Sequence, residues 1–141
     1  MTQFSNKSYL TKADPLTGSS WNEVSPKARA LFRAITKHTK RRPYIRSVYF
    51  KKDKIFLTFF WHHLSQKTYP NQLRRMKYLP CAIELVRNSR LHPTSMQNPN
   101  KPAETLHRFS GITKSNKRFM VQIKEFKQTD RKELMSIFPY D

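Results

Sequence analysis

The C-terminal segment 104–139 constrains the fold most strongly, because side chains alternate between apolar and more polar along three parts of it. Residues 118–126 (RFMVQIKEF) show this alternation most clearly, and residues 104–112 and 133–139 share it. The polar sequences TKSNK and QTDRK separate the three parts and are typical of turns, and Pro139 closes the last part. We therefore expect a three-stranded antiparallel meander here.

Two stretches before this meander have the spacing of amphipathic helices. The first is expected to start at Pro26 with Ser25 as its N-cap, and to end in the cationic run KHTKRRP at Pro43. The second covers residues 71–90, where Leu, Met, Ile and Val recur at helical spacing. Pro80 is expected to break or restart this second helix.

A β-hairpin is expected between the two helices. Residues 44–50 alternate, KKDK forms a turn, and residues 54–61 (KIFLTFFW) are rich in aromatic and β-branched side chains. Residues 91–103 carry three prolines and predict a loop. The expected fold class is α+β: an N-terminal helix, a hairpin, a second helix and the meander form one small antiparallel sheet. This single domain spans residues 21–141 and follows a flexible arm, residues 1–20.

The cysteine content and the hydropathy of the chain indicate the cellular compartment. The single Cys81 rules out an internal disulfide. No stretch approaches the ~18 apolar residues of a transmembrane helix. The first ten residues lack the apolar centre of a signal peptide. A cytoplasmic protein is expected.

The charge indicates the kind of partner. Twenty-eight Lys and Arg face nine Asp and Glu, which gives a net charge of +19. Phosphate backbones are the commonest partner that relieves the self-repulsion of such a chain. Membrane surfaces are usually met by a lipid anchor or a basic amphipathic helix, and neither is evident. RNA is the expected partner, with DNA as the alternative. The side chains expected to hold the nucleic-acid backbone are Lys37, Lys40, Arg41, Arg42, Arg74, Arg75 and Lys77.

The distribution of acidic residues excludes several kinds of enzyme. No carboxylate pair has the spacing of a two-metal nuclease, and two glycines are too few for a Gly-rich phosphate loop. No metal and no other cofactor is expected. RNA carries its own nucleophile, the 2′-hydroxyl, so its cleavage needs a base, an acid for the leaving oxygen, and cations at the phosphate. Metal-independent RNA cleavage is the hydrolytic chemistry that this composition supports.

One group of suitable side chains follows the hairpin, in the sequence WHHLSQK. If this stretch is helical, His63 and Lys67 lie four residues apart on one face. His62 and Gln66 form the equivalent pair on a neighbouring face, and the sequence does not separate the two. The alternative is that both histidines cap a strand end and Lys67 is merely solvated.

A second group lies on the expected sheet. His107 and Arg108 are adjacent on one strand, so alternation sends them to opposite faces unless a bulge intervenes. Gln122 and Lys124 share a face of the middle strand, and Ser136 lies on the last strand. This face is either the ordinary wet side of an antiparallel sheet or a phosphate-binding surface.

Motif order adds a resemblance to a known family. The segments FFWHHLSQK, RRMKYLPCAIELVRNSR, NPN, LHRFSGIT, FMVQIKE and LMSIFP occur in this order. Over roughly residues 44–139, the chain resembles the BECR-fold (barnase, EndoU, colicin and RelE-like) nucleases of phages and mobile elements. The resemblance implies helices before a small antiparallel sheet, with the active site on the exposed face of that sheet. It also implies RNA cleavage without a metal to a 2′,3′-cyclic phosphate, often by a toxin or effector that a protein inhibitor holds in check.

The family's residues can be carried over position by position. Its early histidine matches His63 or His62, its basic sheet position matches Lys124, and its final-strand Ser or Thr matches Ser136. The N-terminal helix with its KHTKRR tail is less typical of the family.

Together these observations predict a metal-independent endoribonuclease with His63 as general base or acid. Lys67, Arg108 and Lys124 would contact the phosphate, Ser136 would orient it, and His107 would be a reserve proton carrier. The alternatives are a non-catalytic RNA- or DNA-binding accessory protein and a binder of acidic proteins.

Overall fold

The computed structural model describes residues 7–64 and 68–140, in which seven strands form one mixed sheet. The strands are β1 (Tyr9–Leu10), β2 (Tyr44–Ser47), β3 (Asp53–Phe56), β4 (Thr94–Gln97), β5 (Glu104–Ile112), β6 (Arg118–Phe126) and β7 (Lys132–Pro139). Their order is β1-β5-β6-β7-β3-β2, and β4 pairs with β5 on the edge that β1 also uses. The helices are α1 (Trp21–Thr36), α2 (Thr58–Leu64), α3 (Tyr69–Lys77) and α4 (Leu79–Asn88).

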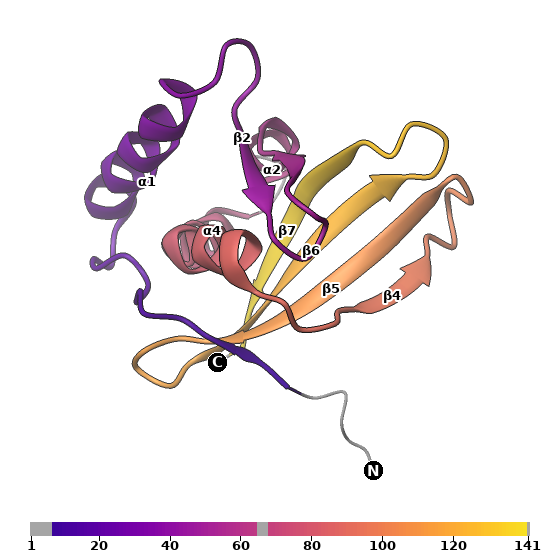
Figure 1. The fold of residues 1–141 in the computed structure, drawn as a ribbon. Helices are drawn as coiled ribbons and strands as arrows, with labels where there is room; N and C mark the ends of the chain where they lie inside the picture. The colour runs from indigo at the N-terminus through magenta and orange to yellow at the C-terminus, as the bar shows by residue number, and fades with distance from the viewer. Residues whose placement is uncertain (1–6, 65–67, 141) are drawn as a thin grey trace.

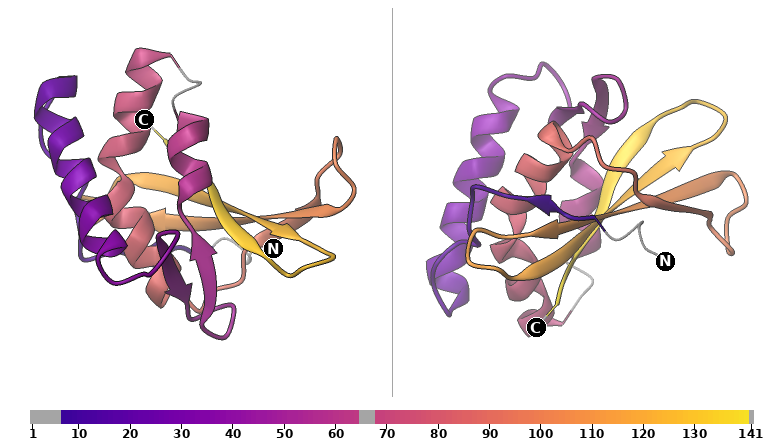
Figure 2. Two further views of the ribbon diagram at one scale, coloured as in Figure 1. Left: turned by 90° about the horizontal axis from the view of Figure 1, so that it is seen from above. Right: turned by 60° about the horizontal axis from the view of Figure 1, so that its bottom comes forward.

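The sheet curves around α4, with β2 on one side of this helix and β5 on the other (Figure 1, Figure 2). The strand residues on the side of the sheet that packs into the hydrophobic core are fully buried: Ile55, Phe119, Val121, Ile123, Leu134 and Ile137. We call this side of the sheet the core face and the opposite side the outer face. None of the helices in the described part of the chain is long and apolar enough to cross a membrane.

The expected fold class is wrong about the sheet. β5, β6 and β7 do form an antiparallel meander. They belong, however, to a seven-stranded half-barrel with parallel pairs, and not to one small antiparallel sheet. β1 pairs in parallel with β5, and β3 pairs in parallel with β7. Each parallel pair aligns only two residues on each strand and joins segments far apart in the chain, so no local periodicity signals it.

The second strand of the expected hairpin is also wrong over most of its length. Residues 54–61 form a strand only as far as Phe56, and α2 follows. Leu57, Phe60 and Leu64 lie at helical spacing in this stretch, and all three are buried. Burial of that helical stripe outweighs the strand preference of the aromatic side chains.

Smaller differences concern the ends of elements. α1 begins at Trp21, earlier than expected, because Ser20 is its N-cap and accepts a hydrogen bond from the Glu23 N–H. This Ser-x-x-Glu pattern is a capping box, and it leaves Pro26 inside the helix. The second expected helix is split into α3 and α4, with Pro80 in the first turn of α4, as a restart at this proline predicts. The expected loop 91–103 contains β4.

Glu84 of α4 anchors the segment before α1. Its carboxylate accepts hydrogen bonds from the Tyr9 hydroxyl at 2.8 Å and from the backbone N–H groups of Lys12 at 2.9 Å and Ala13 at 3.0 Å. Burial raises the pKa of Glu84, but these donors lower it by more, so the pKa lies below its usual value. Residues 9–13, part of the expected arm, therefore lie against the domain.

This anchor predicts a pH dependence of stability. Because the folded-state pKa of Glu84 is depressed, the carboxylate stabilises the fold above its unfolded pKa near 4.5. That contribution is lost as the pH falls through the lower folded pKa. Glu84→Gln should lower the melting temperature at neutral pH, and the difference from wild type should shrink well below pH 4.5. A difference that stays constant over this range would contradict the role of the charge.

Gly111 on β5 makes a second prediction about the fold. A Cβ added there would lie 2.5 Å from Cζ of Phe119 and 2.8 Å from Cδ1 of Leu85. Both neighbours belong to the packed core, so Gly111→Ala should lower the free energy of unfolding by about 1–3 kcal/mol. Chemical denaturation measures this, with Ser110→Ala on the outer face as the matched control. Equal stability of the two variants would show that the core can relax.

Candidate anion-binding site on the outer face

Strand register brings two predicted site residues, Arg108 and Ser136, into one row with Gln122 on the outer face. Arg108 on β5 is opposite Gln122 on β6, and Gln122 is opposite Ser136 on β7. The Arg108 guanidinium donates from Nε and Nη2 to Oε1 of Gln122, at 3.1 and 2.7 Å. Gln122 and Ser136 are buried, so the row is a fixed part of the sheet.

An irregularity in β7 is needed for this row. Leu134 is opposite Ile123 and Ser136 is opposite Gln122, which leaves Met135 as an extra residue in β7. With regular pairing, Ser136 and Leu134 would lie on the same face. The bulge therefore turns Ser136 to the outer face while Leu134 and Ile137 stay in the core.

Arg75 of α3 reaches the end of the row. Its Nη1 donates to Oγ of Ser136 at 2.6 Å and to the backbone oxygen of Ile137 at 2.9 Å. The guanidiniums of Arg75 and Arg108 both lie over the Phe138 ring, at 5.0 and 4.9 Å from its centre. We call Arg75, Arg108, Gln122, Ser136 and Phe138 the arginine cluster.

The arginine cluster has no acidic counterpart. In the described part of the chain, neither Arg75 nor Arg108 forms an ion pair with a carboxylate. Burial, and then the neighbouring charge of Arg74, lowers the pKa of Arg75. Two guanidiniums that share one aromatic ring without a carboxylate form a site suited to an anion, and phosphate matches their fork of donors.

Helix α2 adds a histidine beside the meander. α2 follows β3 and packs against β7, where Figure 2 shows it alongside the strand. The half-buried His63 stacks on Phe59 one turn earlier, with ring centres 5.5 Å apart. The buried ammonium group of Lys124 on β6 lies 3.8 Å from the centre of the same Phe59 ring. His63 and Lys124 are thus both in contact with one side chain of α2.

Lys124 differs from the two arginines in its surroundings. Its Nζ is 3.9 Å from Oε2 of Glu104, which is also buried, and 5.1 Å from the centre of the Phe126 ring. Its charge is therefore partly balanced inside the protein. This lysine fits a role in shaping the field of the outer face better than direct contact with a flexible ligand.

His107 lies on the core face, away from Arg108, as alternation predicts. Its Nε2 is 2.7 Å from Oε1 of Glu125, and its Nδ1 is 2.7 Å from Oγ of Ser95. Its ring also packs against Phe50, at 5.1 Å between centres. Within the described residues, the structure therefore does not bring His107 to the other predicted site residues.

The other predicted residues fall in several places. His62 is exposed on α2, and Lys67 lies outside the described residues. Arg74 donates to the backbone oxygen of Pro139 at 3.4 Å, beside the arginine cluster. Lys37 is the exposed C-cap of α1, and the half-buried Lys77 ends α3.

Lys40, Arg41 and Arg42 line a hollow of about 780 Å³ that is separate from the cluster. We call this hollow the basic pocket. The remaining residues that line it are His38, Tyr44, Lys54, Phe56 and Arg131. Three of the predicted nucleic-acid contacts are thus gathered around two aromatic rings.

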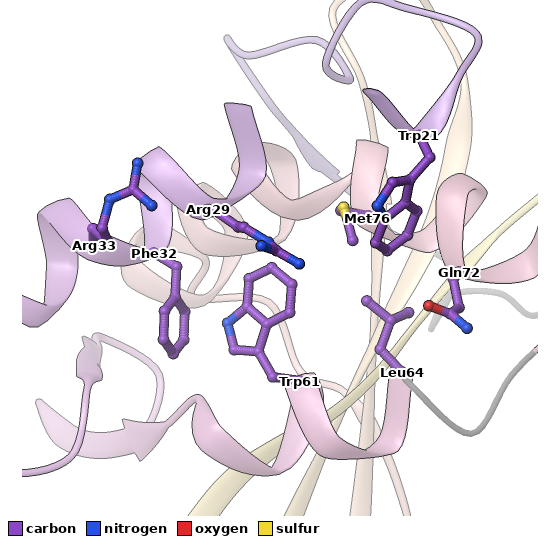
Figure 3. A pocket seen from close by; sticks show the side chains of 8 residues that line it. All are labelled: Trp21, Arg29, Phe32, Arg33, Trp61, Leu64, Gln72 and Met76. Carbon is purple, nitrogen blue, oxygen red and sulfur yellow. The ribbon is translucent and has the colours of Figure 1, made fainter. Parts of the chain in front are cut away.

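A second hollow, of about 380 Å³, lies between α1, α2 and α3 (Figure 3). It is lined mainly by apolar side chains, with Trp61 at its centre and Arg29 and Arg33 on α1. The indole nitrogen of Trp61 is buried without a hydrogen-bond partner among the described residues. In Figure 3 this nitrogen lies toward the Phe32 ring; the centres of the two rings are 5.0 Å apart and their planes meet at 87°, an edge-on arrangement. The residues that line this hollow include no general acid or base.

Comparison with known proteins gives no indication of the function, which is therefore inferred from the geometry of the site. No family model matches the chain, and no curated protein or solved structure matches it either. Among the described residues, no three His, Cys, Asp or Glu side chains gather as a metal site would require.

Sequence reasoning missed part of the cluster. It predicted Arg75 as a contact to the nucleic-acid backbone on an outward-facing side of the helix, expected Phe138 in the core, and gave Phe59 no role. Phe138 could have been found, because it lies two residues from Ser136 and shares its face. The contact of Arg75 with Ser136 joins residues 61 positions apart and has no local signal.

Adjacent residues on opposite faces provide a direct test of this arrangement. Arg108→Ala should weaken binding of a phosphate-rich polymer such as RNA, and the loss of its two hydrogen bonds to the buried Gln122 side chain should also lower the free energy of unfolding by about 1–3 kcal/mol. His107→Ala should leave RNA binding unchanged, because His107 lies on the core face, while the loss of its hydrogen bonds with Glu125 and Ser95 should lower the free energy of unfolding by roughly 1–3 kcal/mol. Denaturant titration and fluorescence anisotropy measure the two effects. Loss of RNA binding in a folded His107→Ala protein would contradict the assignment of faces.

Proposed function

We propose that this protein is a metal-independent endoribonuclease that binds an RNA phosphate at the arginine cluster. The observation that carries the proposal is the pair of guanidiniums, Arg75 and Arg108, held on either side of Ser136 and Gln122 without a carboxylate. Preorganised cations of this kind stabilise the charge that develops on a phosphate during transfer. They do so without a metal ion, provided that a side chain supplies the proton transfer.

His63 is the proposed proton carrier. It lies on α2, which packs against the strand that contributes Ser136 and Phe138, and its ring is partly shielded by Phe59. In the proposed reaction the 2′-oxygen forms a bond to phosphorus while the bond to the 5′-oxygen breaks. The proton leaving the 2′-hydroxyl passes to a base, and a proton reaches the 5′-oxygen from an acid. The products are a 2′,3′-cyclic phosphate and a 5′-hydroxyl.

The remaining groups have supporting roles in this proposal. The hydroxyl of Ser136 accepts a hydrogen bond from Arg75 and so directs its own proton outward, toward a bound phosphate oxygen. Arg75 and Arg108 bind the non-bridging oxygens. Lys124 raises the local positive potential from below the surface, and Gln122 fixes the orientation of Arg108.

A cleavage assay with labelled RNA in excess EDTA tests the proposal. His63→Ala should reduce cleavage by about 10²–10⁴-fold while RNA affinity stays within a few-fold of wild type. His62→Ala, the neighbouring and more exposed histidine, is the matched control and should retain activity. Arg75→Ala should lose both affinity and cleavage, because it removes a phosphate contact.

Three outcomes would overturn the nuclease assignment: no cleavage by wild type, full activity of His63→Ala, or an absolute need for Mg²⁺. Tight and steeply salt-dependent RNA binding without turnover would instead support a non-catalytic binding protein, for which the net charge of +19 is the specific observation. Growth arrest on expression of wild type but not of His63→Ala would favour the nuclease.

A further inference from the structure

The basic pocket lies on the same outer face as the arginine cluster. Tyr44 on β2 is opposite Phe56 on β3, and Phe56 is opposite Glu133 on β7. Glu133 in turn is opposite Lys124 on β6. Residues that are opposite each other on paired strands have their side chains on the same face of the sheet. Ile55, which lies between Lys54 and Phe56, is buried in the core, so Lys54 and Phe56 lie on the outer face. The pocket and the cluster therefore lie on the same face of four neighbouring strands.

The basic pocket combines cations with aromatic rings. Lys54 Nζ lies 4.8 Å from the centre of the half-buried Tyr44 ring, and the guanidinium of Arg46 lies 5.4 Å from it. Arg131 lies over Phe56 at 4.2 Å. The cations that line the pocket are Lys40, Arg41, Arg42, Lys54 and Arg131, and none of the acidic side chains that the structure describes lines it.

Two nearby carboxylates are already paired within the protein. Asp53 receives the Lys132 ammonium at 2.9 Å, and Glu133 receives Arg131 Nε at 2.8 Å. A third, Asp130, lines an adjoining hollow. Of the five cations in the pocket, Arg131 is the one with an acidic partner among the described residues. The pocket therefore offers positive charge around a flat apolar surface.

We propose that the basic pocket binds one unpaired nucleotide of a single-stranded RNA whose scissile phosphate lies at the arginine cluster. The base would stack on Tyr44, and the loop cations Lys40, Arg41 and Arg42 would contact the adjoining phosphates. Aromatic rings beside a basic groove are the usual means of holding single strands, because every base has a stacking face. A duplex keeps its bases stacked inside and cannot use the pocket.

The separation of the two sites sets the length of RNA required. Ser136 and Tyr44 are two strand spacings apart across the sheet and a few residues apart along it, or roughly 10–15 Å. A single strand of several nucleotides would span both sites. This proposal deepens the proposed function by naming single-stranded RNA, and it rests on that function for the location of the scissile phosphate.

Binding of a 12-nucleotide single strand to variants in the His63→Ala background, which is not expected to cleave, tests the pocket. Tyr44→Leu should weaken binding about 5- to 150-fold, the range measured when one base–aromatic stack is removed. Tyr44→Phe keeps the ring and should bind within about twofold of its parent. Affinity for a duplex of the same sequence should not change. Thermal melting shows whether each variant is folded.

Removal of cations from the pocket and a change of ligand test the proposal in two further ways. Arg41→Ala with Arg42→Ala should reduce the slope of log affinity against log salt by about two for the single strand. Lys114→Ala, in the turn between β5 and β6, should leave this slope unchanged. A free nucleotide should compete only weakly with the 12-mer. Equal affinity for the free nucleotide would overturn the assignment to RNA.

The two proposals fail in different ways. If wild type cleaves RNA but Tyr44→Leu binds the 12-mer as well as its parent, the pocket assignment is wrong and the nuclease assignment stands. If nothing is cleaved but Tyr44→Leu still weakens single-strand binding, the pocket assignment stands without the nuclease.

Discussion

One extra residue in β7 determines which side chains share the outer face. The bulge at Met135 puts Ser136 beside Gln122 and keeps both Leu134 and Ile137 in the core. Regular pairing would put Ser136 on the core face or turn one of the two apolar residues to the outer face. Because each of these exchanges is costly, the core fixes the bulge. The bulge then fixes the row of polar groups on which the proposed site depends.

The few acidic side chains explain why this row remains positively charged. Seven of them bond to groups of the same chain: Asp14, Glu23, Asp53, Glu84, Glu104, Glu125 and Glu133. They cap a helix, anchor the N-terminal segment and balance buried Lys124 and Lys132. Acids thus serve the fold, and the cations of the outer face are largely left for a partner. The same division accounts for the net charge without requiring that every lysine bind a ligand.

The sequence predicts the central part of this protein better than its edges. The segments 104–112 and 118–126 become β5 and β6 with the same bounds, because alternation there coincides with long antiparallel ladders. Alternation also separates His107 from Arg108 correctly. The two parallel pairs could not be predicted, since each depends on a short contact between distant segments. Residues 57–61 are wrongly assigned to a strand, because the same run of aromatic residues satisfies both the strand preference and the helical spacing.

The edge of β7 shows how protection of the sheet and assembly of the site coincide. β3 pairs with β7 only at Lys132 and Glu133, so the rest of that edge lacks a strand partner. α2 packs along it, and the backbone oxygens of Ile137 and Pro139 accept hydrogen bonds from Arg75 and Arg74 instead of from a strand. Exposed edges invite pairing with other chains, and covering them with helices is a common protection. Here the covering helices bring a histidine and two arginines to one end of the sheet, so the site follows from the way in which this edge is closed.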